Sequence, residues 1–117
     1  MIVLAGKYNI TVDQGATYSQ VFTWKDSNEA PIDLTGYAAR MQVRKRRRDD
    51  PNLLDLTTEN GGITLGSTAG TITVSISADA TAAVAAGDHV YDLELVFGST
   101  VSRLVMGTFT VRGEVTR

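Results

Sequence analysis

The sequence predicts an all-β fold, a single two-sheet antiparallel sandwich of about seven to nine strands. Short segments of alternating apolar and polar residues recur along the chain, and turns rich in glycine, asparagine and aspartate separate them. One alanine-rich segment of helical character interrupts this pattern. A chain of 117 residues can bury the core of one domain without cross-links, and this chain has no cysteine to form any.

The first six residues are predicted to form an N-terminal arm, and residues 7–117 the sandwich domain. The arm is apolar, so we expect Ile2, Val3 and Leu4 either to pair with a neighbouring subunit or to fray. It is too short for a signal peptide and lacks the cationic start of one. No apolar run approaches the roughly 20 residues that span a bilayer. We therefore expect a soluble protein that is made in the cytoplasm and does not enter a membrane.

Two strands are predicted before the first long turn, one from residue 7 to 12 and one from residue 17 to 26. Both alternate with the period of two that a half-buried strand requires. Gly15, in the turn between them, can adopt a positive φ. The opposite face of the longer strand is mostly hydroxylated. The side chains expected to face the core are Tyr8, Ile10, Val12, Tyr18, Phe22 and Trp24.

The segment 31–37, Pro-Ile-Asp-Leu-Thr-Gly-Tyr, is predicted to be a corner where the chain leaves one sheet and enters the other. Pro31 cannot donate to a strand ladder, Asp33 can hydrogen-bond nearby backbone, and Gly36 can adopt a positive φ. The apolar side chains of Ile32 and Leu34 are expected to pack into the core.

Residues 37–46 form the strand after the corner, and short strands are expected over 53–57 and 63–65, with a further sandwich strand over 71–77. In the first of these, Tyr37, Ala39, Met41 and Val43 are predicted to face inward, and Ala38, Arg40, Gln42 and Arg44 outward.

Residues 78–86 are predicted to form one short helix that crosses between the sheets at the edge of the sandwich. Ser77 or Asp79 can cap its first turn, and Gly87 can end it. The strand that follows, 89–97, has the strongest alternation in the chain. Its predicted inward residues are Tyr91, Leu93, Leu95 and Phe97, and its outward residues are Val90, Asp92, Glu94 and Val96.

The last strand returns through a hairpin loop, and its apolar residues change parity. Leu104 and Met106 share one face, whereas Phe109 and Val111 share the other. Because strict alternation cannot bury both pairs, we predict a β-bulge near Gly107 and Thr108.

Few residues have the chemistry of a reaction centre. His89, the one histidine of the sequence, is expected at the surface or an edge, without a role. Asp92 and Glu94 share a strand face and could serve a glycosidase or bind a hard cation. Charged residues are common at alternate outward positions, however, and Arg103 on the hairpin partner is a natural ion-pair mate. We therefore predict no enzyme, no catalytic residue, no metal site and no cofactor.

The outlier in the charge pattern is a basic cluster. It holds six of the 11 cationic residues in a chain of formal net charge −2. Three interpretations remain open: the cluster contacts nucleic-acid phosphates, it docks on an acidic patch of a partner protein, or it is a solvated loop partly neutralised by Asp49 and Asp50. All aromatic residues fall on core-facing parity, which makes nucleic acid the less favoured partner. The cluster consists of Arg40, Arg44, Lys45, Arg46, Arg47 and Arg48.

Four stretches of the sequence form a recognisable series: DQGATYSQVFTW, APIDLTGYAARMQVR, GTITVSISADATAAVAAGDHVYDLEL and VSRLVMGTFTV. Together they resemble a family of small β domains from tailed bacteriophages. The family includes the N-terminal domains of upper baseplate proteins that carry receptor-binding proteins, and short stand-alone virion proteins. The resemblance covers roughly residues 7–112, and the proline-apolar-Asp-Leu-Thr-Gly turn is its most specific part.

The resemblance implies an immunoglobulin-like sandwich that serves as a non-enzymatic building block of the virion, at the tail tip, baseplate or fibre attachment site. Such a module is expected to be oligomeric or multicopy and to bind other virion proteins through its arm, its basic cluster and its edge strands. Three alternatives stay open: a capsid decoration or head–tail connector component, a nucleic-acid-contacting virion protein, and a carbohydrate-binding sandwich. The residues expected to be structural are Trp24, Pro31, Asp33, Gly36, Tyr91 and Gly107.

Overall fold

The computed structural model describes residues 2–3, 6–48 and 52–115 of the chain. The strands of this part are β1 (Ile2–Val3), β2 (Gly6–Lys7), β3 (Ile10–Asp13), β4 (Tyr18–Trp24), β5 (Ala38–Arg44), β6 (Leu54–Thr57), β7 (Ile63–Leu65), β8 (Thr71–Ile76), β9 (Gly87–Phe97) and β10 (Thr100–Arg112). An α-helix, α1 (Ala78–Ala82), and a 3-10 turn, η1 (Ser67–Ala69), complete it. These ten strands are more than the predicted seven to nine. Two of them, β1 and β2, are short pairings of two residues each that the sequence pattern does not reveal.

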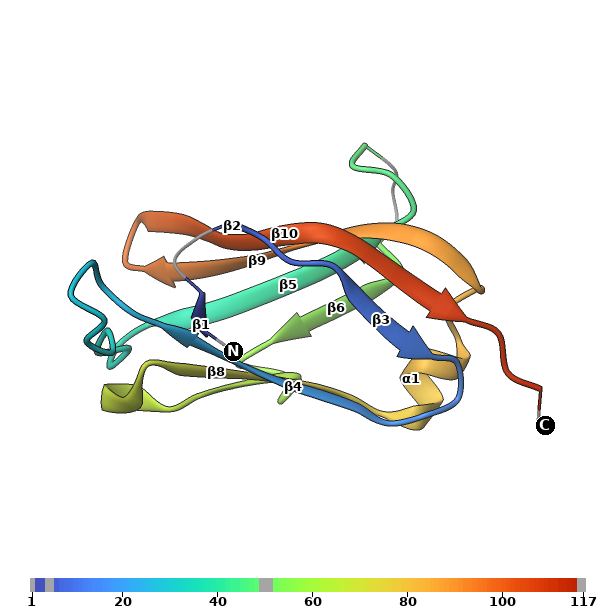
Figure 1. Ribbon diagram of the computed structural model, residues 1–117, viewed down its shortest axis with the longest axis horizontal. Helices are drawn as coiled ribbons and strands as arrows, with labels where there is room; N and C mark the ends of the chain where they lie inside the picture. The colour runs from blue at the N-terminus through green and yellow to red at the C-terminus, as the bar shows by residue number, and fades with distance from the viewer. Residues whose placement is uncertain (1, 4–5, 49–51, 116–117) are drawn as a thin grey trace.

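The strands pack as two sheets, with α1 at the end of the sandwich near the C-terminus (Figure 1). One sheet has four strands in the order β1-β4-β8-β7. The other has the order β2-β10-β9-β5-β6, and β3 also pairs with β10. The pairings of β1, β2 and β3 are parallel, and the remaining described pairings are antiparallel. The two-sheet all-β sandwich predicted from the sequence is confirmed.

The core lies between the two sheets and follows the predicted alternation along the central strands. In β5 the predicted inward residues Ala39, Met41 and Val43 are buried, and in β9 so are Tyr91, Leu93 and Leu95. Phe22 of β4 packs edge to face on Tyr8, with ring centroids 5.5 Å apart. Burial of apolar side chains on both sheets is therefore the main stabilising term of the fold.

The predicted corner is confirmed, because it leads from β4 in one sheet to β5 in the other. Leu34 is buried, and the Asp33 carboxylate accepts hydrogen bonds from the Thr35 backbone N–H (2.9 Å) and hydroxyl (2.6 Å). These bonds hold the pKa of Asp33 below its ordinary value. Gly36 has a φ of 83°, the left-handed region that glycine adopts without strain. The Tyr37 ring packs on Trp24 at a centroid distance of 6.1 Å.

The helix crosses between the sheets as predicted, from β8 to β9, but it is shorter than the predicted 78–86. Ser77 caps it by accepting a hydrogen bond from the Ala80 backbone N–H at 3.1 Å. The buried Thr81 hydroxyl donates to the Ala16 carbonyl at 2.8 Å, which fixes the helix to the turn before β4. The chain then leaves the helix to bury Val84, so packing overrides the helix propensity of the remaining alanines. Gly87 begins β9 instead of ending the helix.

The burial predicted for both ends of β9 is wrong. His89 is 4% exposed and not at the surface, because the segment before the strand folds over it. Its Nε2 lies 2.8 Å from the Ala85 carbonyl oxygen. Phe97, predicted to face inward, is 51% exposed. It ends the strand beside the hairpin loop and has Tyr37 as a ring neighbour, with centroids 5.0 Å apart.

The β-bulge also lies elsewhere than predicted. The β9–β10 register shifts between Arg103 and Val105, and it is continuous through Gly107, which pairs with Tyr91. Leu104 and Val105 are therefore consecutive and both buried. Gly107 is required for another reason: a Cβ atom there would overlap the carbonyl oxygen of Tyr8.

The N-terminal segment pairs with strands of its own chain. The backbone of Ile2 and Val3 lies parallel to β4, and Lys7 lies opposite Met106 of β10. Neither of the two predicted fates of the arm included this arrangement. Leu4, the third residue predicted to make an arm contact, lies outside the described residues.

The half-buried Tyr18 and the buried Tyr91 predict how stability depends on alkaline pH. Burial raises the pKa of Tyr18 from its ordinary value of 10.0 to about 12, and burial also raises the pKa of Tyr91. The folded state disfavours the phenolate form of Tyr18. The contribution of Tyr18 to the free energy of unfolding is therefore fully present below pH 10.0, and it is lost as the pH rises to about 12. Urea unfolding followed by Trp24 fluorescence should show this decrease, and Tyr18→Phe should reduce it. A loss of stability that begins below about pH 9 would have another cause.

Candidate site on the outer face of the six-stranded sheet

The strand register places charged and polar side chains in rows across the outer face of the six-stranded sheet. Arg40, Glu94 and Arg103 form one row. The other rows are Gln42, Asp92, Met106 and Lys7, and then Arg44, Val90 and Thr108. The bulge in β10 switches the parity of that strand, and so Met106 and Thr108 join Arg103 on this face.

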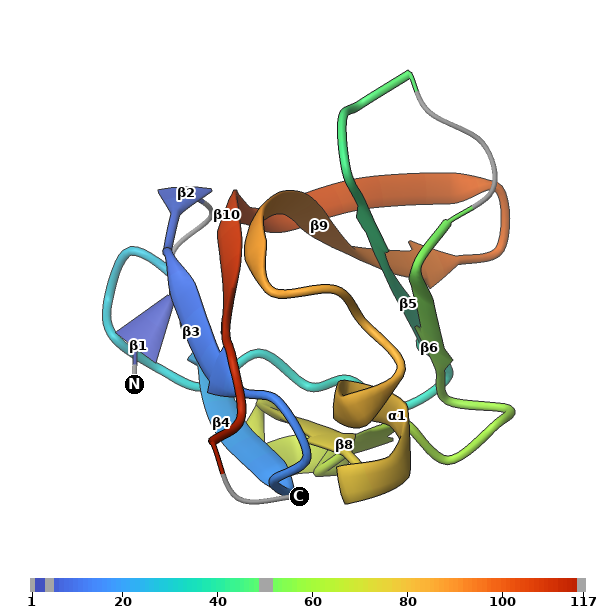
Figure 2. The ribbon, with the colours of Figure 1, turned by 90° about the vertical axis from the view of Figure 1, so that its right-hand side faces the viewer.

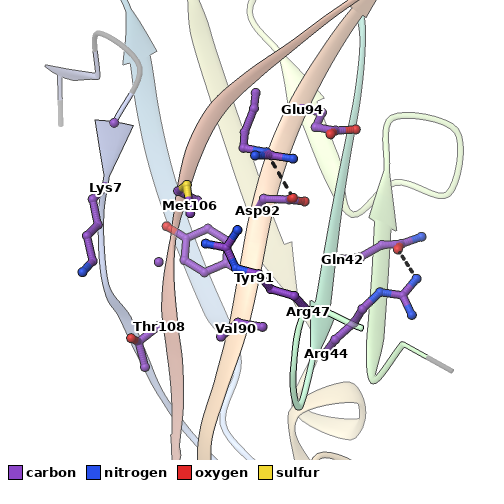
Figure 3. Close-up of a pocket in the computed structure, with 13 residues that line it drawn as sticks. Lys7, Gln42, Arg44, Arg47, Val90, Tyr91, Asp92, Glu94, Met106 and Thr108 are labelled. Atoms are coloured by element: carbon purple, nitrogen blue, oxygen red, sulfur yellow. Dashed lines mark hydrogen bonds and ion pairs between the residues drawn. The ribbon is translucent and has the colours of Figure 1, made fainter. Parts of the chain in front are cut away.

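An open groove of about 810 Å³ lies over these rows. Figure 3 shows Lys7 of β2 on one side and Gln42 and Arg44 of β5 on the other, with β9 and β10 between them. The Arg47 side chain extends from the loop after β5 in the direction of β10 (Figure 3). The groove is lined by Gly6, Lys7, Gln42, Arg44, Arg47, Val90, Tyr91, Asp92, Glu94, Arg103, Met106, Gly107 and Thr108.

Both carboxylates in the groove are held by arginines. Arg103 Nε lies 3.3 Å from Asp92 Oδ2, and Arg40 Nε donates to Glu94 Oε1 at 2.8 Å. The expected pairing of Arg103 with this carboxylate pair is thus confirmed for Asp92, whereas Glu94 pairs with Arg40. These ion pairs are partly exposed and add little to stability. They affect the charge of the groove instead, because they neutralise the two acids on its floor.

The groove has an excess of positive charge. Its lining includes four cations, Lys7, Arg44, Arg47 and Arg103, and two acids, a formal charge of +2 in a chain of net charge −2. Arg44 Nη2 donates to Gln42 Oε1 at 2.8 Å. Among the described residues, neither Lys7 nor Arg47 has an ion-pair partner.

The structure divides the predicted basic cluster. Arg40 and Arg44 project from β5, and Arg47 lines the groove. Lys45, Arg46 and Arg48 are exposed on the loop after β5, which stands away from the sandwich (Figure 2). The proposed neutralisation by Asp49 and Asp50 falls on residues outside the described part of the chain.

Sequence reasoning missed three groove residues, Lys7, Met106 and Thr108. Strand parity could have assigned Gln42, Asp92 and Glu94 to a common face. No local pattern indicates that β2 pairs parallel to β10. The apolar pattern of β10 predicts a change of parity, but it does not place that change at Leu104.

The outer face of the four-stranded sheet has a different character. Its described side chains are mostly hydroxylated, as predicted for β4, and none of them is charged. They are Ser19, Val21 and Thr23 of β4, Thr64 of β7, and Thr71, Thr73 and Ser75 of β8. Among the described outward side chains of the two sheets, the charged ones therefore lie on the groove side.

The described residues offer little support for a metal site, a membrane span or an aromatic binding platform. No group of three or more histidine, cysteine, aspartate or glutamate side chains there could hold a metal ion. No helix in this part of the chain has the length and apolar character needed to cross a bilayer. On the groove face, no outward position of β5, β9 or β10 within the described rows is aromatic.

No protein-family model matches the chain, and no curated protein matches it by sequence. Among solved structures, the endo-beta-1,4-mannanase from Thermotoga petrophila is similar, with a TM-score of 0.50 and 13% sequence identity. The match covers 94% of this chain and 18% of the mannanase chain, so the chain spans less than a fifth of that protein's length. At this identity the similarity concerns the fold alone.

Proposed function

We propose that this chain is a non-enzymatic structural module of a tailed-bacteriophage particle that binds other virion proteins, at the tail tip, baseplate or fibre attachment site. The family resemblance over four stretches of sequence supports the assignment to a particle. The observation that carries the binding role is the groove, an open charged surface whose acids are paired with arginines while Lys7 and Arg47 keep their charge exposed.

A hydrolytic role finds less support in this geometry. Glycoside hydrolysis needs two carboxyl groups in different environments, one to donate a proton and one to act as nucleophile or base. Asp92 and Glu94 are instead alike, because each is bound to an arginine. The groove is better suited to binding than to catalysis.

Sugar binding is the competing function that the similarity to a mannanase raises. Sugar rings pack well on exposed aromatic faces, and the described rows of the groove offer none. Tyr91 lines the groove, but it is a core residue whose hydroxyl donates to the Tyr8 carbonyl at 2.5 Å. Titration with mannohexaose tests this function directly, and binding without sensitivity to salt would favour it.

The particle assignment predicts where the chain will be found. Particles released from cells that carry the coding sequence should contain the chain in a fixed, multicopy ratio to the major structural proteins after density-gradient purification. Quantitative mass spectrometry measures this ratio, with an abundant cytosolic host protein as the contamination control. Immunogold labelling at the tail tip is expected; labelling of the head or neck would favour the decoration or connector alternative. Purified particles that lack the chain would rule out a virion role.

A further inference from the structure

We propose that the groove is a docking site for an extended acidic segment of a partner protein, whose carboxylates bind Lys7 and Arg47. This inference deepens the proposed function and rests on it only for the partner's place in the particle. The chemistry of the site follows from the described residues alone.

The two cations approach the groove from different elements. Lys7 comes from β2, at one edge of the sheet, and Arg47 comes from the loop after β5. The groove that both of them line has a volume of about 810 Å³, which is in the range of ligand clefts. A carboxylate in the groove would therefore meet an ammonium or guanidinium group that has no ion-pair partner among the described residues.

The dimensions favour a chain over a small anion. The groove extends across β2, β10, β9 and β5, and three interstrand spacings amount to about 14 Å. That width corresponds to about four residues of extended polypeptide. In an extended segment, side chains two residues apart lie on the same face, so two carboxylates can reach the two cations together. A single phosphate or acetate ion would fill only a small part of a groove of this width.

The floor of the groove favours polypeptide over nucleic acid. Asp92 and Glu94 lie on it beside the apolar side chains of Val90 and Met106. A nucleic acid would bring a continuous row of phosphates over a floor where Arg40 and Arg103 are already paired with these two carboxylates, without an aromatic platform for its bases. A polypeptide can place its carboxylates selectively at the cations, and its backbone N–H groups and apolar side chains over the acidic and apolar floor.

The test uses the full chain and a fluorescein-labelled dodecapeptide of alternating glutamate and threonine, followed by fluorescence anisotropy. The peptide should bind at low salt, and affinity should fall at physiological salt because the contacts are exposed charges. Lys7→Glu combined with Arg47→Glu should weaken binding at least about tenfold. Lys7→Glu alone is compared with Lys25→Glu, the matched control that makes the same charge change outside the groove and should alter affinity less than about twofold. Trp24 fluorescence verifies that each variant is folded.

Several results would overturn the inference. They are the absence of peptide binding at low salt, an equal loss with Lys25→Glu, and tighter binding of a twelve-nucleotide oligothymidine that depends on Lys7 and Arg47. The last result would assign the groove to nucleic acid. A lysine–threonine peptide of the same length should not bind. If the chain is present in particles but does not bind the peptide, the docking site fails and the virion role stands. If the chain binds the peptide but is absent from particles, the virion role fails and the docking site stands.

Discussion

Replacing Phe22 with alanine is expected to lower the free energy of unfolding by about 3–5 kcal/mol. Phe22 is fully buried in β4, and its ring packs on Tyr8. Tyr8 is bound in turn to the other sheet, because its backbone N–H donates to the Met106 carbonyl at 2.9 Å. The Phe22 ring thus links the two layers of the sandwich, and its removal leaves a cavity between sheets that neither backbone can close.

Equilibrium unfolding in urea measures this loss, with the single tryptophan, Trp24, as the fluorescent probe. Val21→Ala is the matched control because it is the neighbouring residue on the same strand. Val21 points outward and is 42% exposed, so its truncation should change stability by less than about 0.5 kcal/mol. Equal effects of the two substitutions would mean that the register of β4 is shifted by one residue.

The parts of the fold that the sequence predicts well are those with local causes. The alternation of β5 depends on its own residues, and Ala39, Met41 and Val43 are buried as expected. The corner at 31–37 contains its own hydrogen-bond acceptor in Asp33 and its own left-handed residue in Gly36. Such features need no knowledge of which strands are neighbours.

The errors have non-local causes. Helix propensity extends the predicted helix to residue 86, but burial of Val84 ends it earlier. Strand parity predicts that Phe97 faces the core, and a position near the start of a strand predicts that His89 is exposed, but the exposure of both depends on what covers each end of β9. The bulge was assigned to Gly107 because glycine is common at bulges, whereas the closely approaching chain at Tyr8 explains the glycine.

The candidate site was predictable only in part. The basic cluster stands out in the sequence, and it supplies Arg44 and Arg47 to the groove. Lys7 lies far from the cluster in sequence and reaches the groove because β2 pairs with β10. Local periodicity cannot reveal a pairing between the two ends of a chain, so the second cation of the proposed docking site was missed.

Gly107→Ala should affect both the fold and the groove. A Cβ at this position would overlap the Tyr8 carbonyl oxygen and lie 2.9 Å from Asn9 Oδ1, which accepts a hydrogen bond from the Thr108 backbone N–H. The segment that carries Lys7 must then move away from β10. We expect a loss of about 1–3 kcal/mol in the free energy of unfolding, the usual range for overpacking. The acidic peptide should also bind more weakly to the folded variant.

Gly6→Ala separates this effect from a general cost of adding a methyl group to the segment. Gly6 lies next to Lys7 and also lines the groove, but a Cβ there would have no atom within 4 Å. Its stability should therefore match that of the unmodified chain, and its peptide affinity shows what a methyl group on the groove wall itself costs. If Gly107→Ala lowers stability without weakening the peptide, the position of Lys7 does not depend on the β2–β10 pairing. If it changes neither, the close approach of Tyr8 to β10 is not maintained in solution, and the N-terminal wall of the groove is not fixed by Gly107.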